Sequence, residues 1–220
     1  MISVIEKDYH GETARFLYVD GGVESAVYLN PARRNELILS YMKKIAEIIA
    51  FLPESGQVLM IGGAGFSMPR FLLDAYPAMR LTVVEKDVHM LHIAKESFFL
   101  PDDERLKIAE AEGSAFLKQT DVTYDLIIND AFLGPRPDPA LLTDEAMVLM
   151  KSHLTTDGTL LLNTVMSLRG KGAFPGIRLR TNLENRFLYV RCSRCQEWKM
   201  EEEDQNCILT CSDRSLPIHF

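Results

Sequence analysis

The sequence contains no long apolar run. Among its 220 residues, no apolar stretch reaches the roughly 18–20 residues that a helix needs to cross a bilayer. Its first residues, Met1 to Glu6, also lack the charged region, apolar stretch and cleavage site of a signal peptide. We therefore expect a cytoplasmic protein that has no membrane partner.

Positive charge is also scarce, since 24 Lys and Arg residues stand against 31 Asp and Glu residues and the net charge is −7. A protein that follows a nucleic-acid backbone needs clustered basic residues, and here they are scattered. The densest local group fits a solvated helix face and consists of Arg178, Arg180, Arg186, Arg191 and Arg194. We expect no nucleic-acid partner.

Two catalytic signatures are missing as well. The chain has no Gly-x-x-x-x-Gly-Lys-Ser/Thr loop for nucleotide phosphates. It also has no strand-to-helix Gly-x-Ser-x-Gly turn of the kind that exposes a serine nucleophile. These absences argue against a P-loop phosphate site and against a serine hydrolase.

Cysteine is limited to four residues near the end of the chain: Cys192, Cys195, Cys207 and Cys211. Their number and paired spacing are compatible with a tetrahedral zinc site. However, Cys192 and Cys207 fall within predicted strands, where a free thiol commonly acts as a small buried apolar group. We favour structural thiols and no metal, and zinc remains the alternative.

The sequence does contain a regular alternation of apolar runs and helical stretches. The predicted strands are Val58–Ile61, Leu81–Val84, Leu106–Ala109, Tyr124–Ile128 and Thr159–Asn163. The helices predicted between them cover about 67–75, 89–96 and 143–154. Near-continuous apolar strands that alternate with helices are typical of a parallel sheet covered on both faces, so the fold class is α/β.

The two ends of the chain have a different pattern. Strands at Arg15–Val19 and Ser25–Leu29, joined by a turn at Asp20–Gly22, predict a β ribbon within residues 1–30. A two-stranded ribbon is only marginally stable alone, so it should rest on the main domain or on a partner subunit, and we expect a homodimer. Near the other end, Phe187–Val190 and Cys207–Thr210 predict an antiparallel hairpin.

A helix is predicted between the ribbon and the first strand of the sheet. Asn30 is a suitable N-cap, and Pro31 suits the first helical position. Apolar residues recur at helical spacing from there to Phe51, and Pro53 would end the helix.

The strongest site signal is a glycine-rich turn followed by an acidic residue. Gly62, Gly63, Ala64 and Gly65 follow the first predicted strand, where glycine lets the backbone approach a ligand. Glu85 ends the next strand, near the interval at which a carboxylate meets the hydroxyls of a ribose. The turn alone could be purely structural, but the pair favours nucleoside binding.

Asp130 is the third candidate, because it ends the fourth predicted strand at the same edge of the sheet. There its carboxylate could accept a hydrogen bond from a substrate amine. The alternative is that it caps the backbone of the loop that follows.

Several short segments, spread over nearly the whole chain, occur in one order and spacing. They are Val19–Glu24, Val58–Gly63, Leu81–Asp87, Gly113–Leu117, Tyr124–Asp130, Gly134–Glu145, Leu149–Lys151 and Asp157–Gly158. In these segments the chain resembles the spermidine synthases. The resemblance implies a seven-stranded, mostly parallel, Rossmann-like sheet of the methyltransferase type, with a short N-terminal β element and an S-adenosylmethionine-binding domain over 31–220.

The resemblance also implies roles for single residues. Glu85 would bind the ribose, with Lys86 next to it, and Gly62, Gly63, Ala64 and Gly65 would flank the methionine part of the ligand. Gly113, Ser114 and Ala115 would lie beside the adenine. The implied cofactor is S-adenosyl-L-methionine or a related adenosyl thioether.

Four positions differ from the spermidine synthase pattern. Gly65, Ser114 and Leu133 stand where that family has aspartate, and Glu24 stands where it has glutamine. A diamine substrate needs carboxylates both for binding and for activation, and Leu133 can provide neither function. We therefore favour methyl transfer, for which positioning of donor and acceptor supplies much of the rate. Aminopropyl transfer and a non-catalytic nucleoside-binding protein are the alternatives.

The acceptor is expected to be a small molecule. Asp130, Tyr41 and Glu24 are the polar residues that we place beside it, with Asp130 and Tyr41 as catalytic candidates and Asp130 and Glu24 also near the cofactor. For Tyr41 the alternative is an ordinary core position. The loop from Ser167 to Gly176 could select the acceptor.

Overall fold

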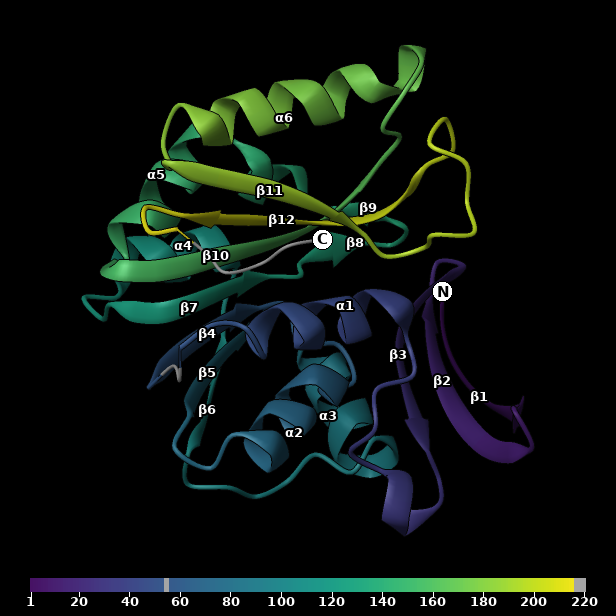
Figure 1. Ribbon diagram of the computed structural model, residues 1–220. Helices are drawn as coiled ribbons and strands as arrows, with labels where there is room; N and C mark the ends of the chain where they lie inside the picture. The colour runs from purple at the N-terminus through teal and green to yellow at the C-terminus, as the bar shows by residue number, and fades with distance from the viewer. Residues whose placement is uncertain (54–55, 216–220) are drawn as a thin grey trace.

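A seven-stranded sheet forms the centre of the computed structural model, which describes residues 1–53 and 56–215 (Figure 1). Its strand order is β11-β12-β10-β7-β4-β5-β6. The strands are β4 (Gln57–Ile61), β5 (Arg80–Glu85), β6 (Leu106–Glu110), β7 (Tyr124–Asn129), β10 (Leu154–Met166), β11 (Tyr189–Arg194) and β12 (Gln205–Ser212). The pairings from β6 to β10 are parallel, whereas β12 pairs antiparallel with both β10 and β11. The predicted fold class is confirmed.

Helices cover both faces of the sheet. One face carries α1 (Ser40–Ile49), α2 (Ser67–Ala75) and α3 (Val88–Ser97), and the other carries α4 (Gly113–Gln119), α5 (Asp144–Ser152) and α6 (Phe174–Glu184) (Figure 1). Successive residues of β4 alternate between the faces, since Val58 and Met60 pack in one core and Leu59 and Ile61 in the other. Each strand face contributes apolar residues to one of two buried clusters, as expected for a parallel sheet covered on both sides.

The N-terminal element has one more strand than the sequence pattern predicts. It is a three-stranded antiparallel sheet of β1 (Ile2–Tyr9), β2 (Glu12–Val19) and β3 (Gly22–Tyr28). β1 is missed because most of its side chains are exposed, so it lacks the apolar alternation of a half-buried strand. The sheet has its own small core, which includes Phe16 and Tyr28.

The helix predicted from Pro31 to Phe51 is wrong in its first half. A single 3₁₀ turn spans Pro31–Arg33, with Asn30 as its cap, and α1 begins only at Ser40. The reason lies in the segment between them, where Leu37 packs in the core of the main sheet and Ile38 packs in that of the N-terminal sheet. An extended segment can bury adjacent residues in two different cores.

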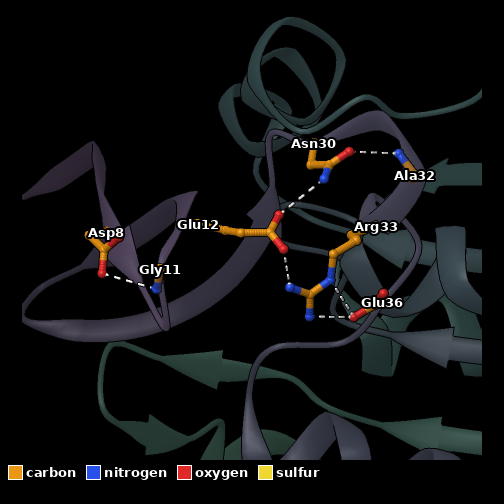
Figure 2. A network of polar contacts seen from close by, with 7 residues as sticks. All are labelled: Asp8, Gly11, Glu12, Asn30, Ala32, Arg33 and Glu36. Carbon is orange, nitrogen blue, oxygen red and sulfur yellow. Dashed lines mark hydrogen bonds and ion pairs between the residues drawn. The ribbon is translucent and has the colours of Figure 1, made fainter.

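Polar contacts hold this segment against the N-terminal sheet (Figure 2). The Arg33 guanidinium is paired with both Glu12 of β2 and Glu36. The Asn30 amide nitrogen donates to the Glu12 carboxylate at 3.2 Å, and its oxygen accepts from the amide of Ala32 at 3.1 Å. These contacts therefore attach the N-terminal sheet to the segment that precedes α1 in the chain.

A small hairpin lies at the carboxyl end of the sheet, in the loop that follows β7. It consists of β8 (Phe132–Leu133) and β9 (Arg136–Pro137) and is followed by a 3₁₀ helix at Pro139–Leu142. Another 3₁₀ turn, Lys171–Ala173, lies in the loop before α6. Within the part of the chain that the structure describes, no helix is both long and apolar enough to span a membrane.

Candidate active site

A cavity of about 350 Å³ lies at the carboxyl ends of β4, β5 and β7. The glycine turn after β4 and Glu85 at the end of β5 line it from the main sheet. The N-terminal sheet contributes Glu24 and α1 contributes Tyr41. We call this space the donor cavity. The predicted turn, acidic residue and strand-four aspartate therefore do meet in one place.

The backbone of the turn requires glycine at its first position. Gly62 has a φ of +93°, which side-chain-bearing residues rarely adopt, and a Cβ there would lie 2.4 Å from the carbonyl oxygen of Asp130. The glycine thus lets strands β4 and β7 bring their ends together at the cavity wall.

The amide groups of the turn are all used within the protein. The Gly62 amide donates to the carbonyl of Val84 at 2.9 Å. Those of Gly63 and Ala64 donate to one oxygen of the Glu85 carboxylate, at 2.8 and 3.0 Å. The Gly65 amide donates to the hydroxyl of Ser25 in β3 at 3.0 Å. No amide of the turn therefore remains for an anionic group of a ligand.

Glu85 is part of this backbone network. Its second carboxylate oxygen accepts from the amide of Asp87 at 2.9 Å, and the residue is 9% exposed. A carboxylate has about four acceptor positions, so three internal hydrogen bonds leave one position for a ligand. That position suits a ribose hydroxyl.

Lys86 is the one basic residue among the described residues that line the donor cavity. Its ammonium group lies 3.2 Å from the carboxylate of the buried Asp138 and 3.7 Å from that of Glu112. Asp138 also accepts from the amide of Ala140 and so begins the 3₁₀ helix after β9. The positive charge of Lys86 is therefore already balanced.

Glu24 and Asp130 form an acidic pair in the cavity wall. Burial raises the pKa of Glu24 to about 8, with further contributions from the charges of Asp130 and Glu85. Burial also raises the pKa of Asp130 to about 7, although hydrogen bonds from Asn163 and Tyr41 oppose the increase. Both carboxyl groups line the same cavity, and a cationic ligand there would lower both pKa values.

Tyr41 connects the two acidic residues. Its hydroxyl donates to the main-chain carbonyl of Glu24 at 3.2 Å and interacts with the Asp130 carboxylate. Burial and these carboxylates raise the pKa of Tyr41 well above its usual value, so it stays a neutral donor. Tyr41 is half-buried and packs against the main core. It therefore lies both at the cavity and at the edge of the core, the two positions considered from the sequence.

A second cavity, of about 280 Å³, adjoins the first, and we call it the acceptor cavity. The wall common to both consists of Glu24, Tyr41, Asp130, Phe132 and Gly134. Asn163 donates to the Asp130 carboxylate at 2.7 Å and accepts from the side-chain amide of Asn206 at 3.2 Å. Asp130 therefore interacts with side chains across the two cavities, and no hydrogen bond among the described residues links its carboxylate to the following loop.

The structure does not bring every predicted residue to the cavity. Gly113 lines it, but Ser114 and Ala115 lie further along the first turn of α4 and are not among the lining residues. Gly65 faces away, since a Cβ there would lie 2.7 Å from that of Ser25. An aspartate at this position would collide with the N-terminal sheet, which gives a physical reason for glycine.

Sequence reasoning missed the amide side chains of the acceptor cavity and the buried Asp138. Asn206 and Gln196 come from the C-terminal hairpin, and nothing in their local sequence marks them. Asn163 carries a signal in retrospect, because it follows an apolar run at the carboxyl side of a parallel strand.

The four cysteines belong to the C-terminal hairpin formed by β11 and β12. Cys195, Cys207 and Cys211 are buried and Cys192 is half-buried, and all have free thiols. Burial raises the pKa of Cys195 to about 12, and a hydrogen bond with Cys207 lowers that of Cys192. Within residues 1–53 and 56–215, no group of His, Cys, Asp and Glu is arranged to hold a metal ion.

The sheet order, the helices on both faces and the nucleoside-sized cavity define a Rossmann-like fold of the methyltransferase type. A family model for the spermine/spermidine synthase domain matches residues 39–168, which is more than half of the chain. The chain belongs to the spermine/spermidine synthase family, as its sequence segments predict.

Curated relatives include two kinds of transferase. A polyamine aminopropyltransferase of Vibrio vulnificus is 26% identical over 145 residues, which cover 64% of this chain and 48% of the relative. The human eEF1A lysine and N-terminal methyltransferase is 30% identical over 120 residues, covering 49% of this chain and 17% of the relative. The chain thus spans about half the length of the aminopropyltransferase.

Solved structures show the same fold. A probable spermidine synthase from Corynebacterium glutamicum matches with a TM-score of 0.83 at 22% identity and covers 98% of this chain and 77% of its own. Human methyltransferase-like protein 13, solved in complex with SAH, matches with a TM-score of 0.68 at 24% identity, covering 80% and 82%.

Proposed function

We propose that this protein is an aminopropyltransferase, which moves an aminopropyl group from decarboxylated S-adenosylmethionine to an amine. The relatives named as polyamine aminopropyltransferases and the family model support this reaction more than the methyl transfer favoured by the sequence pattern. The observation that carries the proposal is the charge of the donor cavity.

A methyl donor has an α-carboxylate, and the donor cavity offers it no counterpart. The amides of Gly62 to Gly65 are engaged internally, and Lys86 is paired with Asp138 and Glu112. Glu24 and Asp130 line the same cavity, and an added carboxylate would raise their pKa values further instead of compensating them. The decarboxylated donor instead carries a sulfonium and an ammonium, which these acidic residues stabilise.

Glu24 supplies the second carboxylate that Leu133, at a position where the family has aspartate, cannot provide. Leu133 lines the donor cavity and cannot activate an amine, but Glu24 stands with Asp130 in the common wall. Two carboxylates are therefore present, one from the N-terminal sheet and one from β7. A pKa near neutrality suits either of them as a general base at physiological pH.

The donor supplies a carbon already activated by its positive sulfur. Glu85 would hold the ribose, while Asp130 and Glu24 would orient the acceptor and take its proton. The acceptor nitrogen forms a bond to that carbon as the carbon–sulfur bond breaks, and the sulfur keeps the electron pair as a neutral thioether. Tyr41 fixes the arrangement by its hydrogen bond to the Glu24 carbonyl.

Isothermal titration calorimetry with decarboxylated S-adenosylmethionine and with S-adenosylmethionine tests the proposal. We expect the decarboxylated form to bind at least about tenfold more tightly and to release protons, because its cations lower the pKa values of Glu24 and Asp130. Formation of methylthioadenosine with an amine present completes the test. Tighter binding of S-adenosylmethionine, or transfer of its methyl group, would establish methyl transfer instead.

A further inference from the structure

The acceptor cavity has charge at one end only. Its lining includes two acidic residues, Glu24 and Asp130, and both belong to the wall common with the donor cavity. No other charged residue in the described part of the chain lines it. The space beyond the common wall is therefore electrically neutral.

The neutral end is formed by amides and apolar side chains. Asn206 donates its side-chain amide to Asn163, and its main-chain amide donates to the side-chain oxygen of Gln196 at 3.2 Å. The second contact orients the Gln196 side-chain amide, whose nitrogen makes no hydrogen bond within the described residues. The remaining lining residues are mostly apolar and include Leu39, Pro135 and Val165.

We infer that the acceptor is a monoamine whose far end is uncharged and forms hydrogen bonds, such as a carboxamide or a hydroxyl group. The inference rests on the proposed function and specifies its substrate class. The reacting amine meets the acidic pair, while the far end meets Gln196 and Asn206. A second ammonium group at that end would lose its hydration without gaining a carboxylate partner, and this desolvation costs free energy.

Three acceptors of matched length test the inference: 4-aminobutanamide, 4-amino-1-butanol and 1,4-diaminobutane. With decarboxylated S-adenosylmethionine and the full chain, methylthioadenosine formation gives kcat/KM for each. We expect 4-aminobutanamide to exceed 1,4-diaminobutane by at least about tenfold, because the site's polar groups are then paired. Equal or better use of the diamine would overturn the inference and leave aminopropyl transfer in place.

Binding separates the two proposals if no acceptor is used. The same amines are titrated into protein saturated with methylthioadenosine, where no transfer can take place. Tighter binding of 4-aminobutanamide than of 1,4-diaminobutane would support the inference even though the proposed reaction had failed. Equal binding, or tighter binding of the diamine, would overturn it.

A substitution of the neutral end gives an independent measurement. Gln196→Glu keeps the oxygen that accepts from Asn206 and adds one negative charge. We expect it to shift the kcat/KM ratio toward 1,4-diaminobutane by about tenfold. Gln119→Glu, at an exposed position on α4, adds the same charge elsewhere and should leave the ratio unchanged. An unchanged ratio in Gln196→Glu would contradict the inference.

Discussion

The donor cavity and the acceptor cavity are built by different means. The donor cavity is built around a backbone turn, whose amides are satisfied by Glu85, Val84 and Ser25. The acceptor cavity is mainly side chains from distant segments, among them Tyr41, Asn163 and Gln196. A site defined by backbone tolerates few substitutions, whereas a site defined by side chains can change its substrate one residue at a time.

Asp130 lies where the two cavities meet, so its substitution should produce the largest effect on activity. Asp130→Asn keeps the shape but removes a general base, and we expect kcat to fall by about 10²–10⁴-fold. The affinity for methylthioadenosine, which is uncharged, should change by less than about threefold. Asp121→Asn, at an exposed position, is the control. Retained turnover in Asp130→Asn would mean that Glu24 acts as the base.

Substitution of the first glycine of the turn at the donor cavity should destabilise the folded protein. Gly62→Ala combines an unfavourable positive φ with a Cβ placed 2.4 Å from the Asp130 carbonyl, and we expect a loss of roughly 3 kcal/mol or more in the free energy of unfolding. Gly21→Ala is a matched control, since its φ is +87° but nothing lies within 4 Å of a Cβ. It should cost only about 1–2 kcal/mol in urea unfolding. Equal losses would mean that the strand ends can separate freely.

The acidic pair should make stability depend on pH. The folded-state pKa values of Glu24 and Asp130, about 8 and about 7, lie above their ordinary values of 4.5 and 3.8. The folded state therefore binds more protons, and this contribution is complete below about pH 4 and is lost as pH rises through 7 to 8.

We expect the free energy of unfolding of the ligand-free protein to fall by roughly 2–4 kcal/mol between pH 5 and 8.5. Glu24→Gln should flatten this dependence, because Asp130 is then the only one of the two residues that titrates. Urea unfolding at several pH values measures both. A profile that does not change in Glu24→Gln would show that folding does not raise the pKa of Glu24.

The contact between the N-terminal sheet and the glycine turn should give the smallest effect. Ser25→Ala removes the acceptor of the Gly65 amide, and we expect a loss of about 1–2 kcal/mol in unfolding free energy. Affinity for methylthioadenosine should fall a few-fold, as measured by calorimetry. An unchanged affinity would show that the turn keeps its shape without the N-terminal sheet.

The sequence predicts the donor cavity better than the acceptor cavity for a physical reason. Gly62 and Glu85 follow consecutive strands, and the carboxyl ends of parallel strands meet at one edge of a sheet. The order of the strands along the chain is therefore enough to predict that Gly62 and Glu85 lie close together. Asn206 reaches Asn163, and brings Gln196 with it, only because β12 pairs antiparallel with β10, and short-range patterns do not encode that pairing.

The same distinction explains the errors at the N-terminus. Alternating apolar residues identify β2 and β3, but β1 is mostly exposed and has no such pattern. The segment after Asn30 has helical periodicity, yet Leu37 and Ile38 lie in a non-helical segment and are buried in separate cores. Tertiary burial there overrides the local preference.

The three internal hydrogen bonds of Glu85 have a kinetic consequence. Because Gly63, Ala64 and Asp87 already fix the carboxylate, the proposed ribose site is formed before any ligand arrives. Little ordering of the protein then accompanies donor association, so the encounter should proceed at the rate typical of preformed sites rather than await a rearrangement. Differences in affinity among adenosyl ligands should therefore arise mainly from differences in their dissociation rate constants.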